Sequence, residues 1–287
     1  MEPLILNGKA LSKQIECELS KRVEVLKQKL SFVPTLATII VGDNPASVTY
    51  VKMKKRACER VGLNSVIVSL PESTTTEELL CEINKLNNDK TICGILLQHP
   101  VPKHIDEMKC FNSIALTKDV DGVNTASFGA YTMGLDAFKC ATPLGIMTLL
   151  NYYNIPLAGK NAVVIGRSAI LGKPVAMLLL NENCTVTICH SKSENLPDIV
   201  KKADIVVAAV GRAKFVKKEW LKEGVVLLDA GYNEGNVGDI DLENCIPVCS
   251  AYTPVPGGVG PMTIASLITQ TVISAERLVE EIEKEKN

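Results

Sequence analysis

The sequence is poor in aromatic residues and has almost no excess of charge. Aromatics make up 4% of its 287 residues, and 31 Lys and Arg stand against 32 Asp and Glu, for a net charge of −1. A chain without a basic surplus or a polybasic tract lacks the usual electrostatic means of binding nucleic acid or a membrane surface, so we expect neither partner. Hydrophobic residues still make up 46%, which is enough for a core and argues against disorder.

Long apolar runs are also missing. No run approaches the ~18 residues that a membrane-spanning helix needs. The opening segment 1–7 is too short and too acidic for a secretory signal. We therefore expect a cytoplasmic protein.

The ten cysteines contain no CxxC pair. Cys184 with Cys189 and Cys245 with Cys249 are the nearest pairs, and the three histidines do not lie at zinc-ligand spacing from them. Reduced cysteines commonly serve as small buried hydrophobic residues. We expect that role here, with neither a metal site nor a disulfide.

Strands alternate with helices along the chain, without internal repeats or low-complexity segments. Such alternation predicts parallel βαβ units with helices on both faces of each sheet. We predict an α/β fold of two lobes with a ligand-binding cleft between them. The first lobe spans 1–142 plus a C-terminal helix of about 263–287, and the second, 143–262, is a Rossmann-like doubly wound parallel sheet.

The individual elements follow from apolar patterning and turn residues. The predicted strands are 35–41, 65–70, 92–98, 161–165, 185–189, 205–210 and 225–229. The predicted helices are 8–30, one opened by Asn44-Pro45, 76–87, 143–153, one in each gap of the second series, and 262–283. The stretch 100–145 is predicted to be rich in loops.

A glycine turn follows the first strand of the second lobe. Gly166 comes directly after that strand, and Gly172 precedes an apolar helix. The backbone N–H groups of such a turn and the N-terminus of the helix offer a site for a pyrophosphate. The spacing is GxSxxxG rather than GxGxxG, and any tight strand-to-helix turn also favours glycine.

The end of the next strand favours NADP over NAD. An NAD site places an acidic residue about 20 residues after the glycine turn, where it binds the ribose hydroxyls. Here that region carries Ser191 and Lys192, with no carboxylate until Glu194, and Arg167 follows the first glycine. A guanidinium and a hydroxyl suit a 2′-phosphate, whereas Lys192 also fits a solvated loop charge.

One lysine lies on the apolar side of its predicted helix. Tyr50 falls within about 60° of Lys54 at the helical repeat, and so do the apolar residues of the next turns. The remaining charges lie opposite: Lys52, Lys55, Arg56, Glu59 and Arg60. Desolvation would lower the pKa of Lys54 towards catalytic usefulness. The same pattern fits an aliphatic stem on the surface with its ammonium in water.

Two polar residues could meet this lysine. Gln98 ends a strand, and ligands of parallel sheets gather beyond the carboxyl ends of strands; a simple strand-end cap is the alternative. Asp121, in KDVDGV, could bind a polar heterocycle through two acceptors, or could simply form an Asp-Gly turn. His99 and His104 have no evident partner and fit loop or packing roles.

Tyr50 and Lys54 also form a Tyr-x-x-x-Lys pair, which is typical of short-chain dehydrogenases. In those enzymes the pair follows the glycine turn. Here it precedes Gly166 by more than a hundred positions. This chain order argues against a short-chain dehydrogenase.

Six stretches resemble the bifunctional methylenetetrahydrofolate dehydrogenase/methenyltetrahydrofolate cyclohydrolase family. They are VGDNPASVTYVKMKKRACERVG, GILLQHPVP, KDVDGV, TPLGIM, VIGRSAILGKPVAMLL and TPVPGGVGPMT. They occur in the family's order and span nearly the whole chain, and the last one is highly specific. The sequence differs from the common family pattern at His99, at Val123-Asn124 and at Cys140-Ala141.

The resemblance implies that the first lobe binds tetrahydrofolate derivatives and the second binds NADP. It implies oxidation of 5,10-methylenetetrahydrofolate to the methenyl form, followed by hydrolysis to 10-formyltetrahydrofolate. Both reactions belong to one-carbon metabolism and supply purine biosynthesis. A homodimer is also implied.

The resemblance also implies roles for individual residues. Lys54 matches the lysine of the hydrolytic step, Tyr50 the tyrosine that stacks on the aminobenzoate ring, Gln98 the glutamine that tunes the lysine, and Asp121 the aspartate that binds the pterin. The remaining matches are Gly166, Arg167, Ser168, Gly172 and Ser191 for the cofactor, and Pro256, Gly257 and Gly258 for the substrate.

Two other functions fit part of the pattern. A two-lobed dehydrogenase of the shikimate or amino-acid type would use a lysine and an acid but would lack the TPVPGGVGPMT loop. A catalytically silent NADP-binding regulator would have no need of Lys54 together with Gln98 and Asp121.

Overall fold

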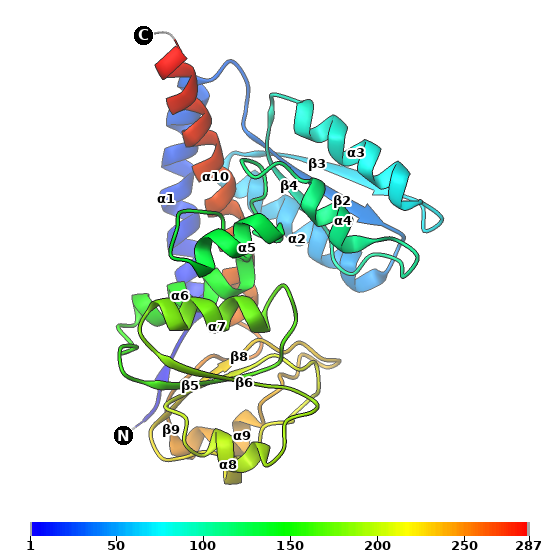
Figure 1. Ribbon diagram of the computed structural model, residues 1–287. Helices are drawn as coiled ribbons and strands as arrows, with labels where there is room; N and C mark the ends of the chain where they lie inside the picture. The colour runs from blue at the N-terminus through cyan, green and yellow to red at the C-terminus, as the bar shows by residue number, and fades with distance from the viewer. Residues whose placement is uncertain (1, 286–287) are drawn as a thin grey trace. The chain divides into compact units, whose positions relative to one another are not determined.

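The computed structural model describes residues 2–285, which form two compact units (Figure 1). The three-stranded unit contains 13–139 and 264–285, and the six-stranded unit contains 2–12 and 140–263. Residues 1, 286 and 287 of the predicted domain ranges lie outside the described residues.

The three-stranded unit is built on a parallel sheet with the order β3-β2-β4. Its strands are β2 (Thr35–Val41), β3 (Asn64–Leu70) and β4 (Ile92–Leu97). Helices α2 (Pro45–Val61) and α3 (Thr76–Asn88) connect successive strands. The two connections run in opposite directions across the sheet, and such crossovers are right-handed, so the helices cover opposite faces (Figure 1).

Two long helices complete this unit. Helices α1 (Gly8–Lys29) and α10 (Val259–Glu285) run side by side in Figure 1. The Arg22 guanidinium donates to both carboxylate oxygens of Glu276, at 2.8 and 2.6 Å. Gln270 of α10 donates from Nε2 to the carbonyls of Val120 and Lys139, at 2.6 and 2.8 Å. These bonds attach the C-terminal helix to α1 and to the loops of this unit.

The six-stranded unit is a parallel sheet with the order β1-β9-β8-β7-β5-β6. The strands are β1 (Leu4–Ile5), β5 (Asn161–Ile165), β6 (Thr185–Cys189), β7 (Ile205–Ala208), β8 (Val225–Asp229) and β9 (Cys249–Tyr252). Helices α6 (Ala141–Tyr152) and α7 (Gly172–Asn181) lie on one face, and α8 (Leu196–Val200) and α9 (Leu242–Cys245) on the other (Figure 1).

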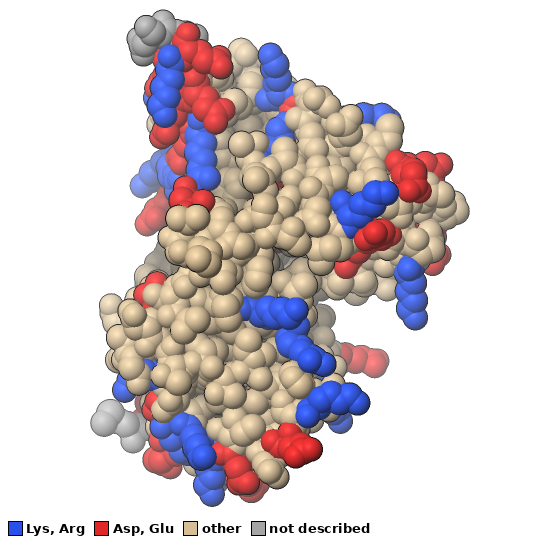
Figure 2. All heavy atoms as spheres, in the orientation of Figure 1, with Lys and Arg blue, Asp and Glu red and all other residues tan. Residues whose placement is uncertain are grey.

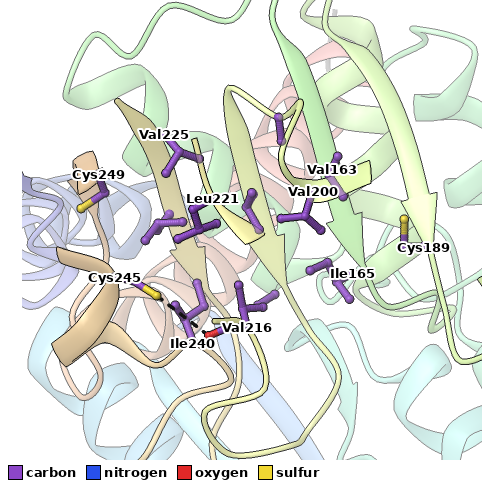
Figure 3. Close-up of a cluster of buried hydrophobic side chains, with 14 residues drawn as sticks. Val163, Ile165, Cys189, Val200, Val216, Leu221, Val225, Ile240, Cys245 and Cys249 are labelled. Carbon is purple, nitrogen blue, oxygen red and sulfur yellow. Dashed lines mark hydrogen bonds between the residues drawn. The ribbon is translucent and has the colours of Figure 1, made fainter. Parts of the chain in front are cut away.

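A buried apolar cluster joins these strands to the loops that follow them (Figure 3). Val163 and Ile165 of β5 belong to it, together with Val216 and Ile240 from segments outside the named strands. Burial of apolar area is the main favourable contribution to folding. The cluster therefore packs the loops of Val216 and Ile240 against the strands.

The predicted α/β class with a Rossmann-like parallel sheet is confirmed, and the differences lie in short segments. The stretch 100–145, predicted as loop, contains α4 (Glu107–Ser113) and α5 (Thr125–Thr132), and α6 begins within it. The side chains of Asp106 and Asn124 cap the first two helices. Helices this short display almost no apolar period, so the cap is their main local signal.

Two further expectations are corrected, and two strands were not predicted. The gap between β7 and β8 holds a single 3₁₀ turn, Lys218–Trp220, where a helix is predicted. Helix α10 begins at Val259, inside the predicted loop, because Pro261 is tolerated in a first helical turn. Strands β1 and β9 escape prediction because each depends on a distant partner, as Leu4 does on Ala251.

The distribution of surface charge and the burial of the cysteines agree with what the composition predicts. Acidic and basic side chains both occur over the face seen in Figure 2. All ten cysteines, which lie within 2–285, are free, and eight of them are buried, which confirms the expected packing role. No helix in that range combines the length and apolarity that a membrane crossing requires.

The cap of α2 gives the first prediction. The Asn44 side chain accepts from the amides of Ala46 and Ser47, at 3.0 and 3.2 Å. Asn44→Ala should therefore lower the free energy of unfolding by about 1 kcal/mol, measured by urea denaturation. Asn44→Ser should restore most of the loss, and Lys52→Ala, on the exposed side of α2, is the matched control. A loss no larger than that of the control would contradict the assignment.

Candidate functional site

Helix α2 carries Lys54 towards the interior of the three-stranded unit. The Asn44 cap and Pro45 start the helix, and Gly62 ends it in the left-handed conformation, with a φ of 84°. Lys54 is 8% exposed and belongs to the buried side of α2. The predicted inward orientation is confirmed, and the alternative of an ammonium in open water is wrong.

Gln98 holds the Lys54 ammonium. The Lys54 Nζ donates to Gln98 Oε1 at 2.9 Å. Gln98 follows β4, where its backbone N–H donates to the carbonyl of Ile39 at 2.8 Å. Its side-chain Nε2 donates to the carbonyl of His99 at 2.7 Å. That second bond turns the amide oxygen, rather than the amide nitrogen, towards the lysine, so Gln98 is more than a strand-end cap.

Burial and one nearby carboxylate shift the pKa of this lysine in opposite directions. Burial lowers the pKa of Lys54, and the charge of Asp121 opposes that shift. Burial raises the pKa of Asp121 to about 6, against the opposing charges of Lys54 and His99. Each group therefore stabilises the ionised form of the other in a setting that disfavours both charges.

The other polar residues of KDVDGV have structural partners. The Lys118 ammonium donates to three carbonyls, at residues 86, 87 and 89, where α3 ends. This is a common way to satisfy the last carbonyls of a helix. Asp119 is buried and accepts from the amides of Val123 and Asn124 and from the hydroxyl of Ser127. These bonds fix the loop that carries Asp121.

Sequence reasoning missed the partners of two histidines. His99 Nδ1 lies 2.7 Å from Glu107 Oε1, and this contact raises the pKa of His99. Glu107 offers no signal in the sequence beyond its place in the first turn of a helix. His104 Nε2 lies 2.9 Å from the carbonyl of Thr74, in agreement with a loop role. Tyr50 lies one turn before Lys54 on α2 and is half-buried.

The glycine turn of the six-stranded unit is tightly packed. Gly166 has a φ of 129°, and a Cβ there would lie 2.2 Å from the carbonyl oxygen of Ala209. A Cβ on Gly172 would lie 2.2 Å from the carbonyl oxygen of Gly166. The Ser168 hydroxyl accepts from the Gly172 amide at 3.2 Å. Only glycine fits at both positions, and the turn delivers its backbone to the N-terminus of α7, as a pyrophosphate site requires.

Arg167 and Ser191 occupy equivalent places beyond neighbouring strands. Ile165 of β5 pairs with Cys189 of β6, and each of the two residues follows two positions later. Both Arg167 and Ser191 are exposed. The structure thus brings a guanidinium and a hydroxyl to the same edge of the sheet.

Pro256, Gly257 and Gly258 also belong to the six-stranded unit, whereas Lys54 and its partners belong to the three-stranded unit. The carbonyl of Gly257 accepts from the Lys9 amide at 2.8 Å. Gly257 has a φ of 106°, which favours glycine there. Within residues 2–285, no group of three or more His, Cys, Asp or Glu side chains could hold a metal ion.

Comparison with known proteins matches two family descriptions to this chain. Residues 6–121 match the tetrahydrofolate dehydrogenase/cyclohydrolase catalytic domain, and residues 140–279 match the NAD(P)-binding domain of the same family. The "Bifunctional protein FolD" of Cellvibrio japonicus is 60% identical over 279 residues, covering 97% of this chain and 100% of the relative.

Two solved structures have the same fold. The bifunctional methylenetetrahydrofolate dehydrogenase/cyclohydrolase FolD of Campylobacter jejuni is 46% identical, with a TM-score of 0.93, and the match covers 95% of this chain and 98% of the other. The Trypanosoma brucei enzyme, solved with NADP and an inhibitor, is 34% identical with a TM-score of 0.93 over 97% of this chain and 99% of the other.

The balance of charges at Lys54 gives a second prediction. Asp121→Asn should lower the pKa of Lys54 further, because it removes the opposing negative charge. Gln98→Glu should raise it, because it places a carboxylate where an amide oxygen now lies 2.9 Å from Nζ. The ¹³Cε NMR signal of Lys54, assigned by its loss in Lys54→Met, reports both shifts during a pH titration. A pKa that neither substitution moves would contradict this geometry.

Proposed function

Because this chain belongs to the tetrahydrofolate dehydrogenase/cyclohydrolase family, we propose that it oxidises 5,10-methylenetetrahydrofolate with NADP and hydrolyses the methenyl product to 10-formyltetrahydrofolate. The observation that carries the proposal is the buried Lys54 ammonium, bound to Gln98 and facing the charge of Asp121. A dehydrogenase that only transferred hydride would have no need of such a lysine.

The first reaction requires positioning rather than proton transfer. Bound NADP would supply the acceptor for the hydride of the methylene carbon. No acid or base is needed for this step, so the chain contributes by holding the substrate. Asp121 offers two carboxylate acceptors to the amino and ring N–H donors of the pterin. Tyr50, half-buried one turn before Lys54, supplies an aromatic face for the aminobenzoate ring.

The second reaction adds water to the methenyl cation and opens the ring. Addition of water to the cation releases one proton. Ring opening then needs a proton on the departing nitrogen, while the hydroxyl loses its proton to solvent as the formyl C=O forms, so the reaction releases one proton overall. A lysine whose pKa is lowered by burial can accept the first proton and donate the second. Gln98 suits this task because its neutral oxygen holds Nζ in place without adding a full negative charge that would raise the pKa.

The cofactor assignment uses the other unit. Gly166, Ser168 and Gly172 shape the turn for the pyrophosphate, and Arg167 with Ser191 would hold the 2′-phosphate. We propose that the six-stranded unit binds NADP, as predicted for 143–262 but with the segment 2–12 added to it, and that the three-stranded unit binds the folate, with Pro256, Gly257 and Gly258 contributing to the substrate site. The free cysteines suit a reducing compartment, so we also propose a cytoplasmic location, and the family resemblance supports a homodimer.

The role of Lys54 gives a third prediction. Lys54→Met should abolish measurable hydrolysis of the methenyl product, a loss on the order of 10²–10⁴-fold or more for a missing proton carrier. The dehydrogenase step should retain part of its rate, because it needs no proton carrier. Absorbance records both steps, as NADPH formation and decay of the methenyl species. Lys52→Met, on the exposed side of the same helix, is the control. Undiminished hydrolysis in Lys54→Met would refute the assigned role.

The role of Arg167 gives a fourth prediction. Arg167→Ala should raise the KM for NADP by about 10- to 100-fold, because it removes a charge-assisted contact to the 2′-phosphate. The KM for NAD, which has no such phosphate, should change little. Lys202→Ala, an exposed change just before β7, should alter neither value. An unchanged NADP-to-NAD preference in Arg167→Ala would exclude the assignment.

A further inference from the structure

Two aspartates of the six-stranded unit are buried within a shell of backbone donors. Asp229, which ends β8, is 2% exposed, and Asp239 is 0% exposed. Asp229 accepts from the amides of Gly231, Asp239 and Ile240, at 2.9, 2.9 and 2.8 Å. Ile240 in turn belongs to the apolar cluster of Figure 3. A buried carboxylate is tolerated only when hydrogen bonds satisfy it, and these donors do so.

Asp239 binds the loop that follows β7. Its Oδ2 accepts from the amides of Val210 and Gly211, at 2.6 and 2.9 Å, and its Oδ1 accepts from the amide of Arg212 at 2.9 Å. Consecutive backbone amides that converge in this way form an anion-binding nest. Here the anion is the protein's own carboxylate, which fixes the conformation of the loop.

The neighbouring glycines are shaped for these carboxylates. A Cβ on Gly231 would lie 2.2 Å from the carboxyl carbon of Asp239, and a Cβ on Gly238 would lie 2.1 Å from Oδ2 of Asp229. Each glycine therefore leaves the space that one aspartate fills. The sequence thus provides the carboxylates and the space around them together.

The loop held by Asp239 lies beside the glycine turn. Strand β5 has β6 on one side and β7 on the other, so the chain reverses its direction across the sheet at β5. In open parallel sheets, dinucleotides bind at the carboxyl end of such a switch point. Ala209 approaches Gly166 so closely that a Cβ on Gly166 would lie 2.2 Å from the Ala209 carbonyl oxygen. The loop after β7 therefore lies on one side of β5 at this edge of the sheet, and Ser191, after β6, lies on the other side.

We propose that Asp239 is a positioning residue for the nicotinamide half of NADP. It acts by holding the loop Val210–Arg212 against the switch point, while Asp229 holds the segment that carries Asp239. The proposal rests on the proposed function, in which Arg167 and Ser191 bind the adenosine half beyond β5 and β6. The two halves of the cofactor then depend on different residues.

The test compares two ligands by isothermal titration calorimetry on the full-length protein. NADP contains both halves, whereas 2′,5′-ADP contains only the phosphorylated adenosine half. In Asp239→Asn, which replaces an acceptor-only group with one that presents donors to the same amides, the affinity for NADP should fall at least tenfold. The affinity for 2′,5′-ADP should stay within about twofold of the wild type, because its contacts lie at β5 and β6.

Further variants keep the test decisive if Asp239→Asn folds poorly. Asn233→Ala removes a single donor to Asp239, the Nδ2 bond of 3.1 Å, and should weaken NADP binding less but with the same selectivity. Asp241→Asn, a buried aspartate that faces Lys214 and Lys217, is the matched control and should leave both affinities unchanged.

The possible results separate the two proposals. Equal losses for both ligands in Asp239→Asn and Asn233→Ala would reveal a merely structural role and overturn the inference, as would unchanged affinities for both. A wild type that bound neither ligand would instead overturn the proposed function.

Discussion

The burial of one ammonium group is the constraint on which the proposed chemistry depends. A lysine taken out of water loses hydration that a protein replaces only with well-placed partners. The Asn44 cap sets where α2 begins, and the helical repeat then carries Lys54 to the buried side. The end of β4 brings Gln98 to within 2.9 Å of Nζ. A neutral partner at that distance satisfies the ammonium without fixing its proton, and Asp121 supplies the balancing charge.

Two neighbouring segments of the six-stranded unit use their backbone donors in different ways. In the six-stranded unit, the amides after β7 are committed to the carboxylate of Asp239, so an external phosphate has no access to those donors. In the turn after β5, by contrast, the glycines bring the backbone to the N-terminus of α7 and Arg167 is exposed, and it is here that we propose an external anion binds. This division of the backbone donors supports the placement of the pyrophosphate at Gly166.

Much of this arrangement is encoded locally. The direction of Lys54 follows from its spacing relative to the charged residues of its helix. The position of Gln98 follows from its place at the end of an apolar strand. The glycine turn can be predicted from the sequence because Gly166 and Gly172 flank a strand-to-helix connection. The proposed preference for NADP rests in the same way on Arg167 and Ser191, which come just after paired strands. The roles of Tyr50, Pro256, Gly257 and Gly258 rest on the family resemblance.

The features that sequence reasoning missed depend on contacts between different elements of the fold. Lys118 ends α3 by binding carbonyls about thirty positions earlier. The contact between His99 and Glu107 needs the short helix α4, whose start is marked by a cap rather than by periodicity. The network of Asp229 and Asp239 gives no signal in the sequence, because Asp229 ends β8 whereas the amides that bind Asp239 follow a different strand, β7. Such networks need β7 and β8 side by side in the sheet, so neither segment of the sequence displays them alone.

The most direct test of the central claim changes the acidity of the Lys54 ammonium and leaves its position unchanged. γ-Thialysine incorporated at position 54 has nearly the shape of lysine but a more acidic ammonium. The pH dependence of methenyl hydrolysis, measured by single-turnover absorbance, should then move to lower pH, while that of the hydride step stays in place. A hydrolysis profile that remains at the pH of the wild type would contradict the claim that the proton of Lys54 is the one transferred.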